Sequence, residues 1–154
     1  MIIQRWQTVL LFIVAVMMAL FSFCSLGQIQ TFNYSYNIAA LGIENITGQN
    51  SGYDVPTIYI FIMSLLSVVL SVIAIFSFKN LRFQKRLCLL IALLIIACCL
   101  CIFLDVYSFS GNVDSTVGWS SVIAAPFIAL IAVLCAWRLI NSDKKKLDSL
   151  DRLR

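Results

Sequence analysis

The fold of this chain is decided by a short basic connector, Lys79-Asn80-Leu81-Arg82-Phe83-Gln84-Lys85-Arg86, which separates two long apolar segments. Four of its eight residues are cationic. Lys and Arg are retained on the cytoplasmic side of a bilayer, so this connector is expected to lie inside the cell. Each apolar segment is expected to cross the bilayer once, so the side on which every other connection lies follows from the position of this connector.

The composition is that of an integral membrane protein. The 154 residues are 62% hydrophobic and 12% charged, and the mean hydropathy is +0.99. A soluble domain is roughly half apolar and about a quarter charged. A soluble chain of this length would have too little polar surface to cover its core, whereas lipid accepts apolar side chains on every face of a helix.

Four apolar segments have the length of roughly 20 residues that a bilayer core requires. Within a single domain, 1–154, they predict transmembrane helices over 8–26, 56–78, 87–109 and 119–140. A cleaved signal peptide is the alternative for the first segment, because Arg5 precedes it, but the segment is long for that role and lacks an Ala-x-Ala site. Pro126 lies inside the last predicted helix and is expected to kink it.

The predicted fold class is an all-α membrane protein, an antiparallel bundle of four transmembrane helices with both termini in the cytoplasm. The connections are a cytoplasmic loop at 79–86, a cytoplasmic tail at 141–154, a long outer loop at 27–55 and a short outer turn at 110–118. In the long outer loop, apolar side chains from Phe32 to Ile38 alternate with polar ones, a period of two that is typical of a strand. With 43–47 as its partner, this segment predicts a short β-hairpin on the helix ends or the headgroup layer.

The cationic side chains gather at three places, the N-terminus, the central loop and the C-terminus. We expect them to orient the chain and to contact anionic lipid headgroups or a protein partner, and we expect no nucleic acid. The candidate contact residues are Arg5, Lys79, Arg82, Lys85, Arg86, Lys144, Lys145, Lys146, Arg152 and Arg154. The leucines of the tail repeat every third residue, which predicts either a helix on the membrane surface or a docking segment for a cytoplasmic partner.

Small residues recur at three- and four-residue spacing on two of the predicted helices, so each set lies on one helix face. Such faces allow close helix–helix packing in membranes. The second predicted helix carries Ser64, Ser67 and Ser71, and the fourth carries Ala125, Ala129, Ala132 and Ala136. A polar pathway along the serines is the alternative, and it would need a carboxylate that this helix lacks.

Asp105 is the one acid of the third predicted helix. It lies about 27 Å along that helix, close to the outer interface, where water or the outer loop can contact it. A role in handling protons or cations is the alternative interpretation.

The cluster Cys98-Cys99-Leu100-Cys101 suggests a metal site, but adjacent helical side chains diverge by about 100° and the chain has no histidine, so packing is the expected role.

Three stretches resemble one known family. Met1-Ile2-Ile3-Gln4-Arg5-Trp6-Gln7-Thr8 is similar to its M-I-Q-R-x-Q-T start, 78–88 to its F-K-N-R-x-x-Q-x-R-L-C loop, and 148–154 to its S-x-D-R-L-R ending. The family comprises four-helix inner-membrane proteins of Bacteroidetes and is catalogued as domain of unknown function 4293. The resemblance implies a bacterial inner membrane and no glycosylation, and it supplies no activity and no site residues. Lys144–Lys146 depart from it, since acidic residues are expected there.

The predicted function is that of a non-catalytic component that binds a partner or scaffolds an assembly. The family-like residues fall at the cytoplasmic ends of the helices, which favours contact with a partner. A small oligomeric transporter or channel is the alternative, although only serines offer polar groups at the midplane. We predict no enzyme activity, no catalytic, cofactor-binding or metal-binding residues and no cofactor, because no carboxylate pair, histidine or nucleophile with a base is found.

Overall fold

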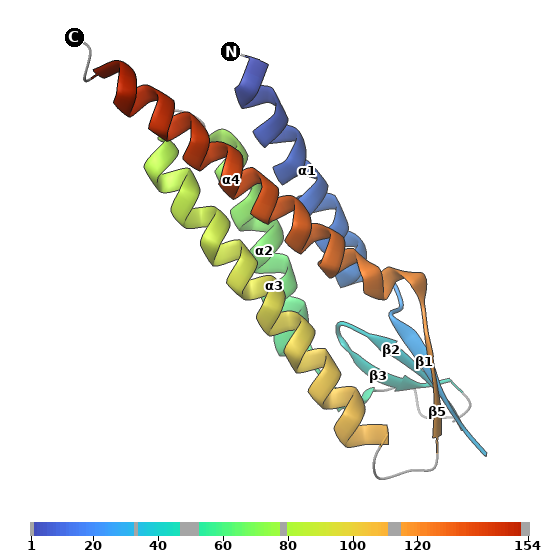
Figure 1. Ribbon diagram of the computed structural model, residues 1–154. Helices are drawn as coiled ribbons and strands as arrows, with labels where there is room; N and C mark the ends of the chain where they lie inside the picture. The colour runs from blue at the N-terminus through green and yellow to red at the C-terminus, as the bar shows by residue number, and fades with distance from the viewer. Residues whose placement is uncertain (1, 33, 47–52, 78–79, 111–114, 152–154) are drawn as a thin grey trace.

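The computed structural model of the chain describes residues 2–32, 34–46, 53–77, 80–110 and 115–151, with side chains for 6–32, 34–46, 56–77, 80–108 and 116–143. Four long helices and a small sheet make up this part of the chain (Figure 1). The elements in order are α1 (Ile2–Phe23), β1 (Gly27–Thr31), β2 (Ser35–Ala39), β3 (Gly42–Asn45), β4 (Tyr53–Pro56), α2 (Ile58–Phe76), α3 (Leu81–Ser110), β5 (Ser115–Trp119), the 3-10 turn η1 (Ser121–Ala124) and α4 (Ala125–Asp151).

The helices pack in sequence, α1 on α2, α2 on α3 and α3 on α4, and α4 returns to pack on α1. The chain reverses direction between consecutive helices, so the N-terminus and the C-terminus lie at the same end, away from the sheet (Figure 1). Except for Gln7, the largest fully buried side chains of this interior are apolar, and they include Leu11, Met18, Phe21, Ile60 and Ile91.

Each helix is long and apolar enough to cross a membrane. The four candidate spans are Trp6–Phe23, Ile58–Phe76, Leu81–Ser108 and Ser121–Asp143. Large apolar side chains on all four helices point away from the protein interior, an arrangement that soluble proteins avoid. Examples are Phe12 at 60% exposure, Ile62 at 58%, Leu93 at 59% and Ile131 at 63%.

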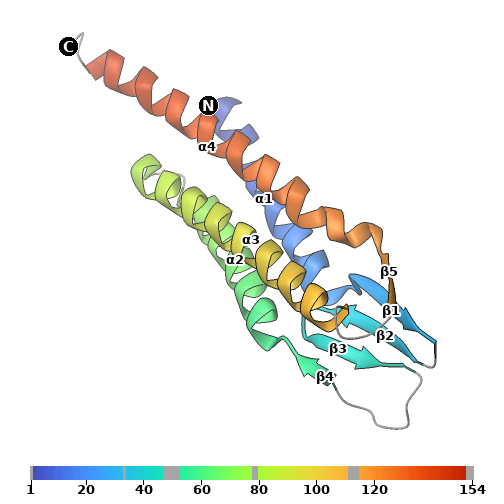
Figure 2. The same ribbon diagram turned by 60° about the horizontal axis from the view of Figure 1, so that its bottom comes forward.

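The sheet is antiparallel and has the strand order β4-β3-β2-β1-β5. Its β2–β3 pair, with Ile38 opposite Ile43, is the hairpin predicted from the alternating residues. Thr47, at the end of the predicted partner strand, lies outside the described residues. The sheet is larger than the predicted hairpin, because β1, β4 and β5 add three more strands. β5 comes from the connection between α3 and α4, and it joins the strands between α1 and α2 in one sheet (Figure 2).

One face of the sheet packs on the ends of the helices. Ile29, Ile38 and Ile43 are buried in the same apolar cluster as the helix interior, whereas Gln28 and Gln30 on the other face of β1 are exposed. Backbone hydrogen bonds from Ser120 N to Leu26 O, at 2.9 Å, and from Thr57 N to Leu41 O, at 3.1 Å, tie the strands to the adjoining helices. The sheet is therefore a fixed cap on the helices.

Several helix boundaries differ from the predicted ones. α1 begins at Ile2 and α4 begins at Ala125, not at 8 and 119. α3 begins at Leu81, so most of the predicted cytoplasmic loop is helical, and α4 runs on to Asp151, so residues 141–151 of the predicted tail form its last turns. Nothing in a polar, charge-rich sequence prevents a helix from continuing beyond its apolar part. Pro126 lies in the first turn of α4, after η1, where a missing N–H has no helical partner, so the predicted interior kink is wrong.

Candidate functional site: a cationic groove at the helix ends

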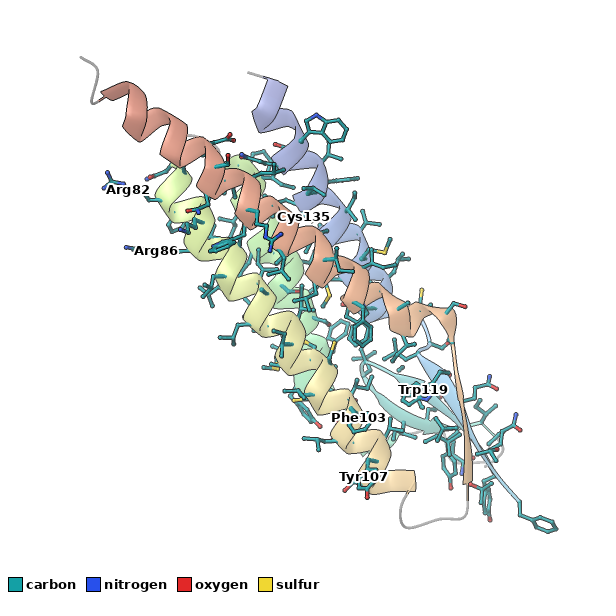
Figure 3. The ribbon with its side chains drawn as sticks, viewed as in Figure 1. Arg82, Arg86, Phe103, Tyr107, Trp119 and Cys135 are labelled. Carbon is teal, nitrogen blue, oxygen red and sulfur yellow. The ribbon has the colours of Figure 1, made fainter. Side chains whose placement is uncertain are left out.

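A groove with a volume of about 500 Å³ lies at the end of the helices opposite the sheet. Its wall on α3 carries three cations followed by two leucines, and its wall on α4 carries one tryptophan. The lining residues are Arg82, Lys85, Arg86, Leu89, Leu90 and Trp137. Arg82 and Arg86 extend outward from the start of α3 (Figure 3), and both are exposed.

Lys85 is held in place by α4. Its Nζ donates a hydrogen bond of 2.8 Å to Asn141 Oδ1 and lies 5.2 Å from the centre of the Trp137 ring. A cation over an indole face is attracted by the ring quadrupole. The ammonium group is therefore positioned at the groove.

Two buried glutamines fasten the helices around this groove. Gln7 of α1 is 2% exposed, and its Nε2 donates a hydrogen bond to Asp143 Oδ2 of α4. Gln84 of α3 is also 2% exposed, and its Nε2 donates to the carbonyl of Ala74 on α2 at 3.2 Å. Buried amides of this kind fix the relative position of helix ends because a lost partner is costly.

The roles of Gln7, Gln84 and Asp143 were not predicted from the sequence. The sequence did contain one indication of the two glutamines, since Gln7 and Gln84 both lie in the stretches that resemble the family. No such indication pointed to Asn141, Asp143 or Trp137, which lie outside those stretches. Two buried atoms at this end, Gln84 Oε1 and Trp137 Nε1, have no hydrogen-bond partner among the described residues.

The predicted cationic contacts are only partly within the described chain. Arg82, Lys85 and Arg86 come together in the groove. Arg5 lies on α1 and Lys144–Lys146 lie on α4, with side chains outside the described set, and Lys79, Arg152 and Arg154 lie outside the described residues altogether.

Both predicted small-residue faces are buried. Ser64, Ser67 and Ser71 are 0% exposed. Their hydroxyls donate to carbonyls three residues earlier on α2, at 2.9, 2.7 and 2.7 Å, and Ser22 of α1 donates to Ser64 Oγ at 2.8 Å. On α4, Ala125, Ala129, Ala132 and Ala136 are at most 6% exposed.

Asp105 lies near the end of α3 that faces the sheet, two residues before Tyr107, which Figure 3 labels at that end. Its side chain is partly exposed, and Oδ2 accepts a hydrogen bond from the hydroxyl of Tyr59 on α2. This contact joins the ends of α2 and α3 that face the sheet. Asp105 lies near a helix end and not at mid-length, its location at the outer interface stays a prediction, and Tyr59 was not predicted as its partner.

The cysteines are free thiols, with Cys98 buried and Cys99 and Cys101 partly buried. Among the described residues, no three metal-ligating side chains come together.

A second cavity, of about 510 Å³, lies between α3, the start of α4 and Trp119, and its walls include Phe21, Phe103 and Phe127. This lining is apolar and offers no group to orient a polar ligand.

The comparison with known proteins identifies a family. The model of the family described as a domain of unknown function (DUF4293) matches residues 3–153. Among curated proteins, none matches the chain. The resemblance predicted from the two termini and the central loop is thus confirmed over nearly the whole sequence. The chain belongs to the DUF4293 family.

Proposed function

We propose that this protein is a non-catalytic, multi-pass component of the bacterial inner membrane that binds a partner or scaffolds an assembly at its cytoplasmic end. In this proposal α1 to α4 form a transmembrane four-helix bundle. Both termini and the cationic groove lie in the cytoplasm, and the sheet lies on the outer side.

The distribution of charge supports this orientation. Arg82, Lys85 and Arg86 lie at the end of the helices opposite the sheet. The segments 24–57 and 111–120, which contain the strands, carry no Lys or Arg. Short loops rich in Lys and Arg stay in the cytoplasm. Trp6 and Trp119, exposed at opposite ends of the molecule at 64% and 46%, fit aromatic belts at the two interfaces.

The non-catalytic role is inferred from the chemical types of the polar side chains that are buried between the helices. Among the described residues, every buried polar side chain other than the Cys88 and Cys98 thiols is Gln, Ser or Thr, and none is a carboxylate or a cation. The three serines of α2 bond to their own helix. Proton relays and ion pathways within membranes use ionisable side chains that face the interior. This interior supports a packed scaffold over a transporter or channel within one chain.

The orientation is tested with fusions to the C-terminus of the full chain. A fluorescent protein that matures only in the cytoplasm should fluoresce, and an alkaline phosphatase that is active only outside it should stay inactive. The opposite pair of results would overturn the orientation.

The partner is tested by crosslinking the tagged full-length protein in cells and identifying captured proteins by mass spectrometry. A chain that ends at Asp143 keeps the Gln7–Asp143 hydrogen bond and should insert normally but lose the partner. A full-length variant with Lys144, Lys145 and Lys146 changed to Gln separates loss of charge from loss of length. Recovery of self-crosslinked species alone would favour an oligomeric pore or transporter over the scaffold.

A further inference from the structure

The geometry of the cationic groove points to a bound anionic phospholipid, with its phosphate on Arg82, Lys85 and Arg86 and an acyl chain along Leu89 and Leu90. This inference rests on the proposed membrane location and goes beyond it. A general attraction between basic residues and anionic lipid needs no groove, whereas a site has defined walls and defined contacts.

Among the described side chains, none compensates the charges of the arginines Arg82 and Arg86. They are four residues apart, so they are neighbours on one side of α3, where like charges repel. Neither forms an ion pair or hydrogen bond within the part of the chain that the structure describes. An anion between them would remove the repulsion, and the planar guanidinium group binds phosphate oxygens through two N–H donors.

Lys85 completes the cationic part of the site. Its ammonium group has three N–H donors, and Asn141 accepts from one of them. The remaining donors are available at the groove. Because Asn141 and the Trp137 ring already hold Lys85, less conformational freedom is lost when it binds an anion.

The apolar part of the groove favours a lipid over a soluble phosphate as the natural occupant. Leu89 and Leu90 follow Arg86 by three and four residues, about 5 to 6 Å further along α3 toward its apolar centre. They are 60% and 49% exposed. Trp137, on the opposite wall, is a residue typical of the membrane interface. A headgroup phosphate with an acyl chain below it matches this order of cations, indole and leucines.

The preferred headgroup should carry no cationic group. An amine or choline would bring a positive charge toward three cations, which is unfavourable. We therefore expect phosphatidylglycerol to bind in preference to phosphatidylcholine.

The test is native mass spectrometry of the purified full-length protein, titrated with each of these lipids in detergent. The double variant Arg82→Gln/Arg86→Gln removes two cations from exposed positions. It should weaken phosphatidylglycerol binding roughly 30-fold, since each cation near an anionic lipid contributes about fivefold. Arg138→Gln is the matched control, because Arg138 is exposed on α4 but does not line the groove, and it should leave binding unchanged.

Two further measurements complete the test. Arg82→Lys/Arg86→Lys keeps the charge but loses the planar guanidinium groups, so it should bind phosphatidylglycerol more tightly than the glutamine variant and more weakly than the unchanged protein. Leu90→Trp should fill the chain part of the groove and weaken binding, whereas Leu93→Trp, one turn further along α3 and outside the groove, should not.

Three outcomes would overturn the inference. They are equal binding of both lipids, equal loss in the Arg138 variant, and full competition by soluble glycerol phosphate, which would indicate a site for a soluble anion. Lipid binding in detergent depends neither on orientation in the cell nor on a protein partner. Its failure is therefore distinguishable from failure of the proposed function.

Discussion

Gly27, at the start of β1, is the residue with the least room for a side chain among the glycines of the sheet. A Cβ atom added to it would lie 2.7 Å from the backbone oxygen of Gly118 on β5. At Gly118 the nearest atom to an added Cβ is Gln28 O, at an ordinary 3.7 Å. Gly27→Ala should therefore destabilise the protein by about 1–3 kcal/mol through overpacking, and Gly118→Ala should have little effect. Thermal unfolding of the two purified variants in detergent checks this, and equal melting temperatures would contradict it.

The contact between Tyr59 and Asp105 should contribute a small amount to stability. Tyr59→Phe removes the hydroxyl that donates to Asp105 and leaves the ring in place. An interhelical hydrogen bond in a membrane protein contributes about 0.6 kcal/mol on average, so the melting temperature should fall slightly. Tyr107→Phe is the control, since that ring is 72% exposed and stacks on Phe103 at 6.5 Å. A larger loss in the control would show that the hydrogen bond has no stabilising role.

Among the elements, α2 depends most on the small size of its buried face. Ser67 is 0% exposed and donates to the carbonyl of Ser64 on its own helix. Ser67→Leu should push α2 away from its neighbours and cost about 1–3 kcal/mol. Ser67→Ala should be close to neutral, because the lost hydrogen bond is not between helices. Val69→Leu, at a position that is 47% exposed, controls for added volume. Unfolding in detergent compares the three variants, and a loss shared by the alanine variant would mean that polarity matters more than size.

Sequence patterns predicted some elements well for physical reasons. In lipid, a single apolar segment as long as the bilayer is thick can form all its backbone hydrogen bonds within itself only as a helix. The existence and number of the helices could therefore be predicted. The β2–β3 hairpin was visible because Tyr36 and Ile38 alternate with polar residues beside a partner that begins at Gly42. The other strands were not visible. β5 pairs with β1, which lies far away in the sequence, so no local pattern indicates this pairing.

The cationic residues of the groove could be predicted from the sequence, whereas the contacts from α4 that form its other wall could not. Lys85 and the two arginines were selected from the sequence because they interrupt an apolar chain. Trp137 and Asn141 contact Lys85 only because α3 and α4 pack together. Lys85 and Asn141 are 56 residues apart in the sequence. No local pattern encodes such a contact, which also explains why the Gln7–Asp143 hydrogen bond was missed.

For the whole molecule, the pairing of β1 with β5 joins the two connections at the sheet end into one unit. Gln30 and Thr116 are paired residues on these strands, and paired Cα atoms in antiparallel strands lie within the range that a disulfide spans. In the proposed orientation the sheet meets an oxidising compartment. Gln30→Cys/Thr116→Cys should therefore form a disulfide in cells, detected by peptide mapping with mass spectrometry.

The control for this prediction is Gln28→Cys/Thr116→Cys, a diagonal pair about 7–8 Å apart, which should stay reduced. If the paired cysteines crosslink only after an oxidant is added to the purified protein, the pairing is correct and the orientation is wrong. If they do not crosslink even then, the pairing itself is wrong.

The strand order also has a consequence for the time course of synthesis. β1 lies between β2 and β5, and its contact with β5 spans 86 residues of sequence, as in the Gln30–Thr116 pair. At about 5–20 residues per second, the ribosome needs roughly 4–17 s to make the intervening chain. During that interval the edge of β1 has no strand beside it and can pair with another chain. The nascent protein is thus most open to aggregation, or to a chaperone, just before its last helix emerges.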